Sequence, residues 1–117
     1  NTLPGNNVNS TSSNQANYLD DAGNGYSVSQ SPALSLTQTY LTNVGAFVNS
    51  TSHYGTFDQT GNVWEWNDLD GKSSKLRGLK GAAWTSTPPY LQSSYRLITV
   101  PASISVNVGM RLAHTYP

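Results

Sequence analysis

The clearest alternation of hydrophobic and polar side chains lies near the end of the chain. Over residues 106–113, valine, methionine and leucine alternate with asparagine, glycine, arginine and alanine. A period of two is typical of a strand with one buried face. The pattern predicts a strand over residues 106–113.

Two further segments of the second half favour strands. Residues 76–84 place leucine and tryptophan among glycines, and residues 95–100 (YRLITV) form an apolar run that stops at Pro101. Proline cannot donate a hydrogen bond to a ladder, so it ends a strand. We expect short strands in both segments.

A tryptophan pair predicts which way a further strand faces. Trp64 and Trp66 flank Glu65. Successive side chains of a strand point to opposite faces. On a strand, both indoles would therefore lie on one side and the carboxylate of Glu65 on the other.

The first half of the chain predicts little regular structure. Residues 1–15 are almost devoid of apolar side chains, which indicates a polar extended arm. Residues 16–36 place a few aromatics among glycine, asparagine, serine and proline, a composition typical of loops. Thr37–Phe47 favours a short strand or a turn of helix that breaks at Gly45. We therefore divide the chain into an arm, 1–15, and a domain, 16–117.

Composition excludes several classes of protein. The 117 residues fit one domain, and six basic residues balance six acidic ones. This balance argues against a basic surface for nucleic acid or for anionic membranes. No apolar run is long enough to insert into a membrane. Serine, threonine and asparagine make up about a third of the chain, above ordinary usage, which favours an extracellular or cell-surface location.

The strongest motif lies at residues 54–66, which read YGTFDQTGNVWEW. This segment resembles the "D-x-x-G-N-V-W-E-W" signature of the formylglycine-generating enzyme, or sulfatase-modifying factor, family. Further segments resemble landmarks of that family in the same order: RGLKGAAW at 77–84, SYR at 94–96 and VGMRLA at 108–113, with weaker matches at 16–18 and 43–47. Four motifs in the right order make coincidence a poor explanation.

The resemblance implies a C-type-lectin-like α+β fold that is rich in loops, with short antiparallel strands and little helix. It also implies a family domain about twice as long as this chain, so residues 16–117 correspond to its carboxyl-terminal half. Two explanations remain open. The chain is a fragment of a longer polypeptide, or another subunit supplies the missing packing surface, which would make oligomerisation structural.

The resemblance further implies calcium. Its ligands would be the side chains of Asp58 and Glu65 and the carbonyls of Gly61 and Val63. Carboxylates and carbonyls in a compact loop suit this hard cation. The alternative is that Asp58 caps a turn while Glu65 makes an ordinary hydrogen bond.

A second calcium site of the family would use the side chain of Asn17 and the carbonyl of Tyr18. Its later acidic ligand has no clear counterpart, because the stretch before Asn43 carries no acid after Asp21.

Catalytic chemistry of the family requires residues that this chain lacks. Active relatives hold copper with two cysteines, at positions that fall near Ser86 and near Leu91–Gln92, and this chain has no cysteine. Hydroxyl and amide groups are poor ligands for Cu(I). Related iron enzymes need a set of histidines, whereas only His53 and His114 are present, and we expect both to be solvated surface residues.

A hydrolase or a separate acidic metal loop is not favoured either. No G-x-S-x-G elbow occurs. Asp68 and Asp70 lie in a D-x-D-G string without the remaining ligands of a calcium loop. We expect a surface turn there.

Three classes of function remain open. The first is a non-catalytic, extracellular, calcium-binding surface module that binds a partner protein or a carbohydrate; its ligand face would include Tyr90, with Trp84 and Tyr95 nearby, although we expect the latter two in the core. The second is a self-assembling subunit of a filament or surface layer, a homo-oligomer. The third is a fragment of a metal-dependent oxygenase whose metal ligands lie on another chain. We expect the first class, closely followed by the second.

Overall fold

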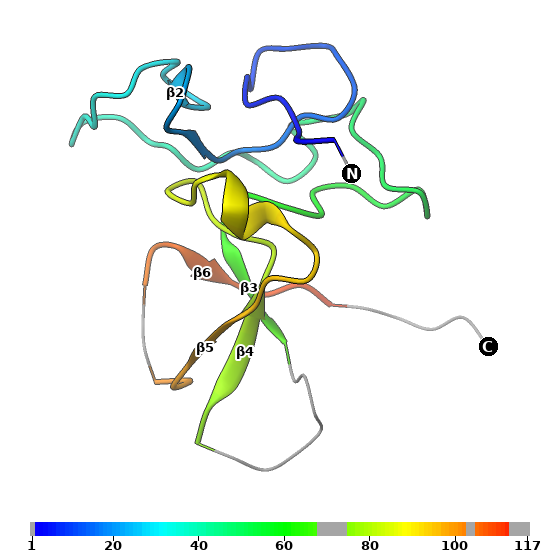
Figure 1. Cartoon of the computed structure of the whole chain (residues 1–117), viewed down its shortest axis with the longest axis vertical. Helices are drawn as coiled ribbons and strands as arrows, with labels where there is room; N and C mark the ends of the chain where they lie inside the picture. Colours follow the sequence, from blue (N-terminus) through cyan, green and yellow to red (C-terminus); the bar gives the residue numbers. More distant parts are fainter. Residues whose placement is uncertain (1, 68–74, 103–104, 113–117) are drawn as a thin grey trace.

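The structure is a computed structural model that describes residues 2–67, 75–102 and 105–112. Loops from the first half of the chain lie above a small sheet formed by the second half (Figure 1). The elements are β1 (Leu19–Asp20), β2 (Gly25–Tyr26), β3 (Trp64–Asn67), β4 (Arg77–Lys80), the 3₁₀ helix η1 (Pro88–Leu91), β5 (Leu97–Thr99) and β6 (Val108–Gly109). The described part of the chain is therefore rich in loops, with small sheets and little helix.

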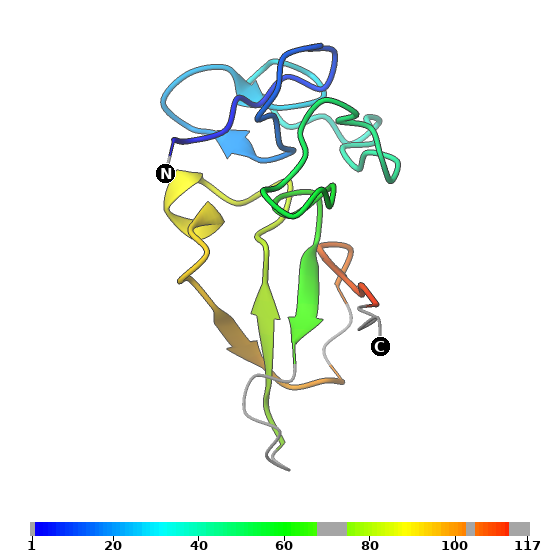
Figure 2. The same cartoon turned by 90° about the vertical axis from the view of Figure 1, so that its right-hand side faces the viewer.

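The main sheet has four strands in the order β5-β4-β3-β6. The β4 strand pairs antiparallel with both β3 and β5, whereas β6 pairs parallel with β3. The turned view in Figure 2 separates β3 and β4 and shows β5 on the far side of β4. The sheet is mixed, and β5 and β6 form its two edges.

The predicted facing of β3 is confirmed by its pairing. Trp66 pairs with Leu79 on β4, and Trp64 pairs with Val108 on β6, so these side chains share one face. Glu65 pairs with Lys80 on the opposite face. Trp64 and Leu79 are buried and form the core of this half together with the adjacent alanines, Ala82 and Ala83.

The strand predicted over residues 106–113 is shorter in the structure, where β6 holds only Val108 and Gly109. Val108 packs against the core, whereas Val106 and Met110 are 75% and 76% exposed. The alternating residues on either side of Val108 therefore stay exposed, and β6 is short.

Thr37–Phe47 is a loop in the structure, neither a strand nor a helical turn. Two sets of contacts hold it in place, one local and one long-range. The Tyr40 side chain is 5% exposed, and its hydroxyl accepts a bond from the Ser35 amide at 2.8 Å. The Asn62 side chain accepts from the Thr42 amide and donates to the Thr42 carbonyl. These bonds take the backbone groups that a helix or ladder would otherwise use.

Residues 2–15 differ from the extended arm expected from their composition. The Gly5 amide donates to the Asn14 carbonyl at 2.9 Å, and the Ala16 amide donates to the Gly5 carbonyl at 2.9 Å, which closes the segment into a loop. The Asn6 side chain is only 3% exposed and donates to the Gly25 carbonyl at 2.8 Å. A buried amide with a backbone partner anchors this loop where an apolar side chain would usually do so.

The helical structure of the described residues is the short 3₁₀ turn η1. Across residues 2–67, 75–102 and 105–112, we find no helix with the length and hydrophobicity needed to cross a membrane.

Candidate functional site

The segment that carries the strongest motif turns tightly before it enters β3. Asp58, Gly61 and Asn62 all have positive φ angles, of 53°, 82° and 68°. A Cβ on Gly61 would lie 2.4 Å from the Asn17 carbonyl oxygen, so this position requires glycine. The Gly61 amide donates to the Gly81 carbonyl at 2.6 Å, which ties the turn to the end of β4.

The Glu65 carboxylate is bound by an arginine from the end of the chain. Arg111 Nε lies 3.0 Å from Glu65 Oε1 and 3.0 Å from Oε2. Its Nη1 donates to the Phe57 carbonyl at 2.8 Å, and its Nη2 donates to the Asp58 carbonyl. The guanidinium thus links β3, the 57–58 turn and the segment after β6.

Three of the four groups expected to hold calcium are engaged with other partners in this arrangement. Asp58 Oδ2 accepts a bond from the Gly45 amide at 2.7 Å, and the Gly61 carbonyl accepts one from the Val63 amide at 2.9 Å. Both oxygens of Glu65 face the guanidinium. Calcium needs six to eight converging oxygens, and these groups are committed to other partners. Among the described residues, no three His, Asp or Glu side chains cluster as a metal site.

The residues expected at a second calcium site form a structural junction. Asn17 is 1% exposed, and its Nδ2 donates to the Tyr40 carbonyl at 2.8 Å and to Asn62 Oδ1 at 3.1 Å. The Tyr18 hydroxyl donates to the Pro4 carbonyl at 2.7 Å. Burial raises the pKa of Tyr18, and the negative charge of Asp20 adds to this effect.

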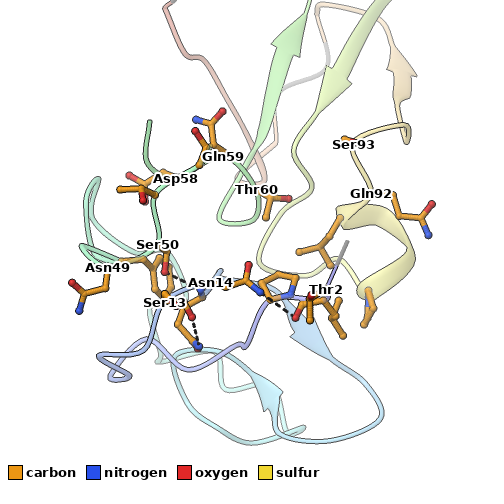
Figure 3. Close-up of a pocket in the computed structure, with 18 of the residues that line it drawn as sticks. Thr2, Ser13, Asn14, Asn49, Ser50, Asp58, Gln59, Thr60, Gln92 and Ser93 are labelled. Carbon is orange, nitrogen blue, oxygen red and sulfur yellow. Dashed lines mark hydrogen bonds between the residues drawn. The ribbon is translucent and has the colours of Figure 1, made fainter. Parts of the chain in front are cut away.

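A pocket of about 800 Å³ opens between the amino-terminal loop, residues 47–52, residues 58–60 and η1. Figure 3 shows hydroxyl, amide and carboxylate groups from these segments around it. Asp58 is the one charged residue among the described lining residues, and Leu3, Phe47, Pro88 and Leu91 provide apolar surface. Its polar lining consists of Thr2, Ser13, Asn14, Gln15, Asn49, Ser50, Thr51, Ser52, Gln59, Thr60, Gln92 and Ser93.

Sequence reasoning missed this pocket. The runs of hydroxyl and amide residues at 13–15 and 49–52 are visible in the sequence, and so is the Pro88-Pro89 pair. Their spacing in the sequence does not predict that these residues lie close together, because they come from loops without a repeating pattern. The tertiary structure brings them together.

The expected ligand face divides into two ring clusters. Trp84 stacks on Tyr40 with centroids 4.9 Å apart. Tyr90 and Tyr95 contact each other at 4.8 Å, and both contact Trp64. Tyr90 is 39% exposed, and Tyr95 packs against the core. The pocket is lined by the residues beside Tyr90 on η1, not by these three rings.

The positions that the family resemblance matches to cysteines hold a buried serine and two residues of the pocket lining. Ser86 is buried, and its hydroxyl accepts a bond from the Ala83 amide at 2.9 Å. Leu91 and Gln92 line the pocket. His53 is exposed beside the Tyr54 ring at 5.2 Å. Asp68, Asp70 and His114 lie outside the described residues.

Comparison with known proteins identifies the family. The chain is 34% identical over 67 residues to a Bos taurus protein named inactive C-alpha-formylglycine-generating enzyme 2, and the aligned part covers 51% of this chain and 22% of that protein. The family model described as the sulfatase-modifying factor enzyme 1-like domain matches residues 3–116. Because this match covers nearly the whole chain, including most of the amino-terminal loop, the chain belongs to the sulfatase-modifying factor enzyme 1-like family.

Proposed function

We propose that this chain is a non-catalytic, extracellular surface module that binds an uncharged polar ligand, such as a carbohydrate or a polar segment of a partner protein. The pocket carries this proposal. Its lining combines many neutral hydrogen-bonding groups with some apolar surface and a single carboxylate. Ligand sites of this size use a few placed polar groups for specificity and apolar surface for affinity.

The absence of thiols supports the non-catalytic part of the proposal. The chain has no cysteine, and Ser86 uses its hydroxyl to satisfy a backbone amide. A hydroxyl so engaged offers neither a soft metal ligand nor an activated nucleophile. The name of the Bos taurus relative, inactive C-alpha-formylglycine-generating enzyme 2, agrees with a domain of this family that lacks catalysis.

The finer fold assignment, a C-type-lectin-like arrangement, is part of the same proposal. Long loops that rest on a small sheet suit recognition, because loops on a rigid base can vary without loss of the fold. The calcium that the resemblance implies is not part of it, since Arg111 holds the Glu65 carboxylate.

Binding can be tested by following backbone amide signals in NMR spectra during titration with neutral oligosaccharides and with serine-rich peptides. We expect shifts at Ser50, Gln59 and Gln92, which line the pocket. Gln92→Trp should fill the pocket and abolish these shifts. Ser94→Trp is a matched control, because Ser94 is exposed and is not among the residues that line the pocket. Shifts that map elsewhere, or equal losses in both variants, would contradict the proposal.

A second candidate function is self-assembly into a homo-oligomer, filament or surface layer. The observation in its favour is apolar surface around the sheet edges, where Ile98 is 53% exposed and Met110 is 76% exposed. Exposed apolar patches often mark contact surfaces. Sedimentation velocity of the wild type and of Ile98→Lys and Met110→Lys variants tests this. A large species that the lysines dissolve supports assembly, and a wild-type monomer excludes it.

The third candidate, a fragment of a metal-dependent oxygenase, would need metal ligands from another chain. Metal analysis of the natural assembly decides it. Copper or iron at one equivalent supports this candidate. The absence of both metals from the assembly excludes it.

A further inference from the structure

Four oxygen atoms of this chain converge on one cationic side chain. They are the two carboxylate oxygens of Glu65 and the carbonyl oxygens of Phe57 and Asp58, and each accepts a bond from Arg111. We infer that the Arg111 side chain takes the place of a bound cation at the 57–65 loop and holds this loop against the segment after β6 without calcium.

The geometry explains why a guanidinium can serve here. Arg111 reaches Glu65 across 46 positions of sequence and the Phe57 carbonyl across 54. A guanidinium presents several donors in a planar fork, so one side chain can satisfy acceptors in different directions. A lysine offers a single nitrogen and could not span the same three groups.

The strand pairing around Glu65 leaves space for the Arg111 side chain on the face of the sheet that carries Glu65. On β6, the residue paired with Glu65 is Gly109, which has no side chain. A Cβ there would lie 2.8 Å from Val63 Cγ2. The face above Glu65 is thus free of a β6 side chain, and Arg111 follows two residues later.

The charges also argue against a second cation. Glu65 is already neutralised by Arg111. A calcium ion at Glu65 would lie within a few ångströms of the guanidinium and would be repelled by it. Calcium could bind only if Arg111 left the site.

The ion pair between Arg111 and Glu65, called the clasp below, is partly exposed, which limits its strength. The side chains of Arg111 and Glu65 are 37% and 25% accessible. Water and salt screen such a pair. Its loss should therefore loosen the loop and lower the melting temperature by a few degrees without unfolding the domain.

Thermal melting in calcium chloride and in a calcium chelator tests the inference. We expect the wild type to melt at the same temperature in both. Arg111→Met should melt a few degrees lower in the chelator, and calcium should restore part of this loss because Glu65 becomes available. Arg96→Met is the matched control, since Arg96 is exposed just before β5; it should melt like the wild type in both buffers.

A double-mutant cycle separates the clasp from general effects of substitution. Glu65→Gln and Arg111→Met should each lower the melting temperature, and the double variant should fall no further than the larger single loss. Two results would overturn the inference: a wild type that calcium stabilises over the chelator, or an Arg111→Met variant that melts like the wild type.

One further measurement keeps the test valid if Arg111→Met does not fold. In NMR spectra of the wild type, the Arg111 Nε–H signal should persist unchanged during titration with calcium chloride. Its loss or displacement at one equivalent of calcium would show that the ion, rather than the arginine, belongs at Glu65.

Discussion

The loop half, residues 2–63, and the sheet half, residues 64–112, use different means to fix their backbone. Among the residues that the structure describes, each half contributes four buried hydrophobic residues, so the number of such residues does not distinguish the halves. The sheet half satisfies its backbone by ladder pairing. In the loop half, amide and hydroxyl side chains satisfy backbone groups far away in the sequence.

This difference teaches that polar side chains can replace secondary structure as a scaffold. Every buried amide and carbonyl needs a partner, and a loop can obtain it from asparagine, glutamine or serine. Asn62 is the clearest case, because its side chain and backbone contact Asn17, Thr42 and Trp84. The loop half should therefore respond most to the loss of hydrogen bonds, and the sheet half to the loss of volume.

The largest expected effect comes from the sheet core. Leu79 is 1% exposed, so Leu79→Ala should lower the free energy of unfolding by about 2–5 kcal/mol through lost burial and a cavity. Urea denaturation measures the change. Leu97→Ala is the matched control, because Leu97 pairs with Leu79 on β5 but is 39% exposed. Equal losses in the two variants would show that the core is not where the structure places it.

The next effect tests the polar scaffold of the loop half. Asn62→Ala removes side-chain bonds to Asn17 and Thr42 and places alanine at a φ of 68°. We expect a loss of about 2–3 kcal/mol in urea denaturation, from unsatisfied polar groups and backbone strain. Asn62→Gly removes the same bonds but tolerates the φ angle. It should recover about 1 kcal/mol of the loss, and a glycine variant as stable as the wild type would mean that the bonds contribute nothing.

A smaller effect isolates a single hydroxyl. Tyr40→Phe keeps the ring stacked on Trp84 but removes the acceptor for the Ser35 amide. The expected loss is about 1 kcal/mol, read from the denaturation midpoint. Tyr26→Phe, in the same ring cluster, is the control and should be nearly neutral. A neutral Tyr40→Phe would weaken the case for polar anchoring of this loop.

The smallest effect appears only at high pH. Burial raises the pKa of Tyr18 above the ordinary value of 10.0, and the charge of Asp20 adds to it. A raised folded pKa means that the stabilisation is fully present below pH 10 and is lost as the pH rises through the folded pKa. Stability of the wild type should therefore fall above pH 10 more steeply than that of Tyr18→Phe. Parallel pH profiles of the two proteins would contradict this.

The sequence by itself determined the family, the absence of thiols and the facing of β3. Those features depend on short-range information, such as the motif at 54–66 and the alternation of Trp64, Glu65 and Trp66. It also indicated that loops would dominate, since glycine, serine and asparagine interrupt most apolar runs.

The tertiary structure alone decided the closed loop at 2–15, the pocket and the contact between Glu65 and Arg111. Composition places Asn6 in a polar extended arm, yet it is buried and bonded to Gly25. The two acids expected to share calcium bind Gly45 and Arg111. Hydrogen bonds from side chains to distant groups have no period and no fixed spacing. Local patterns therefore predict which residues can form such bonds, and only the folded chain decides which partners they meet.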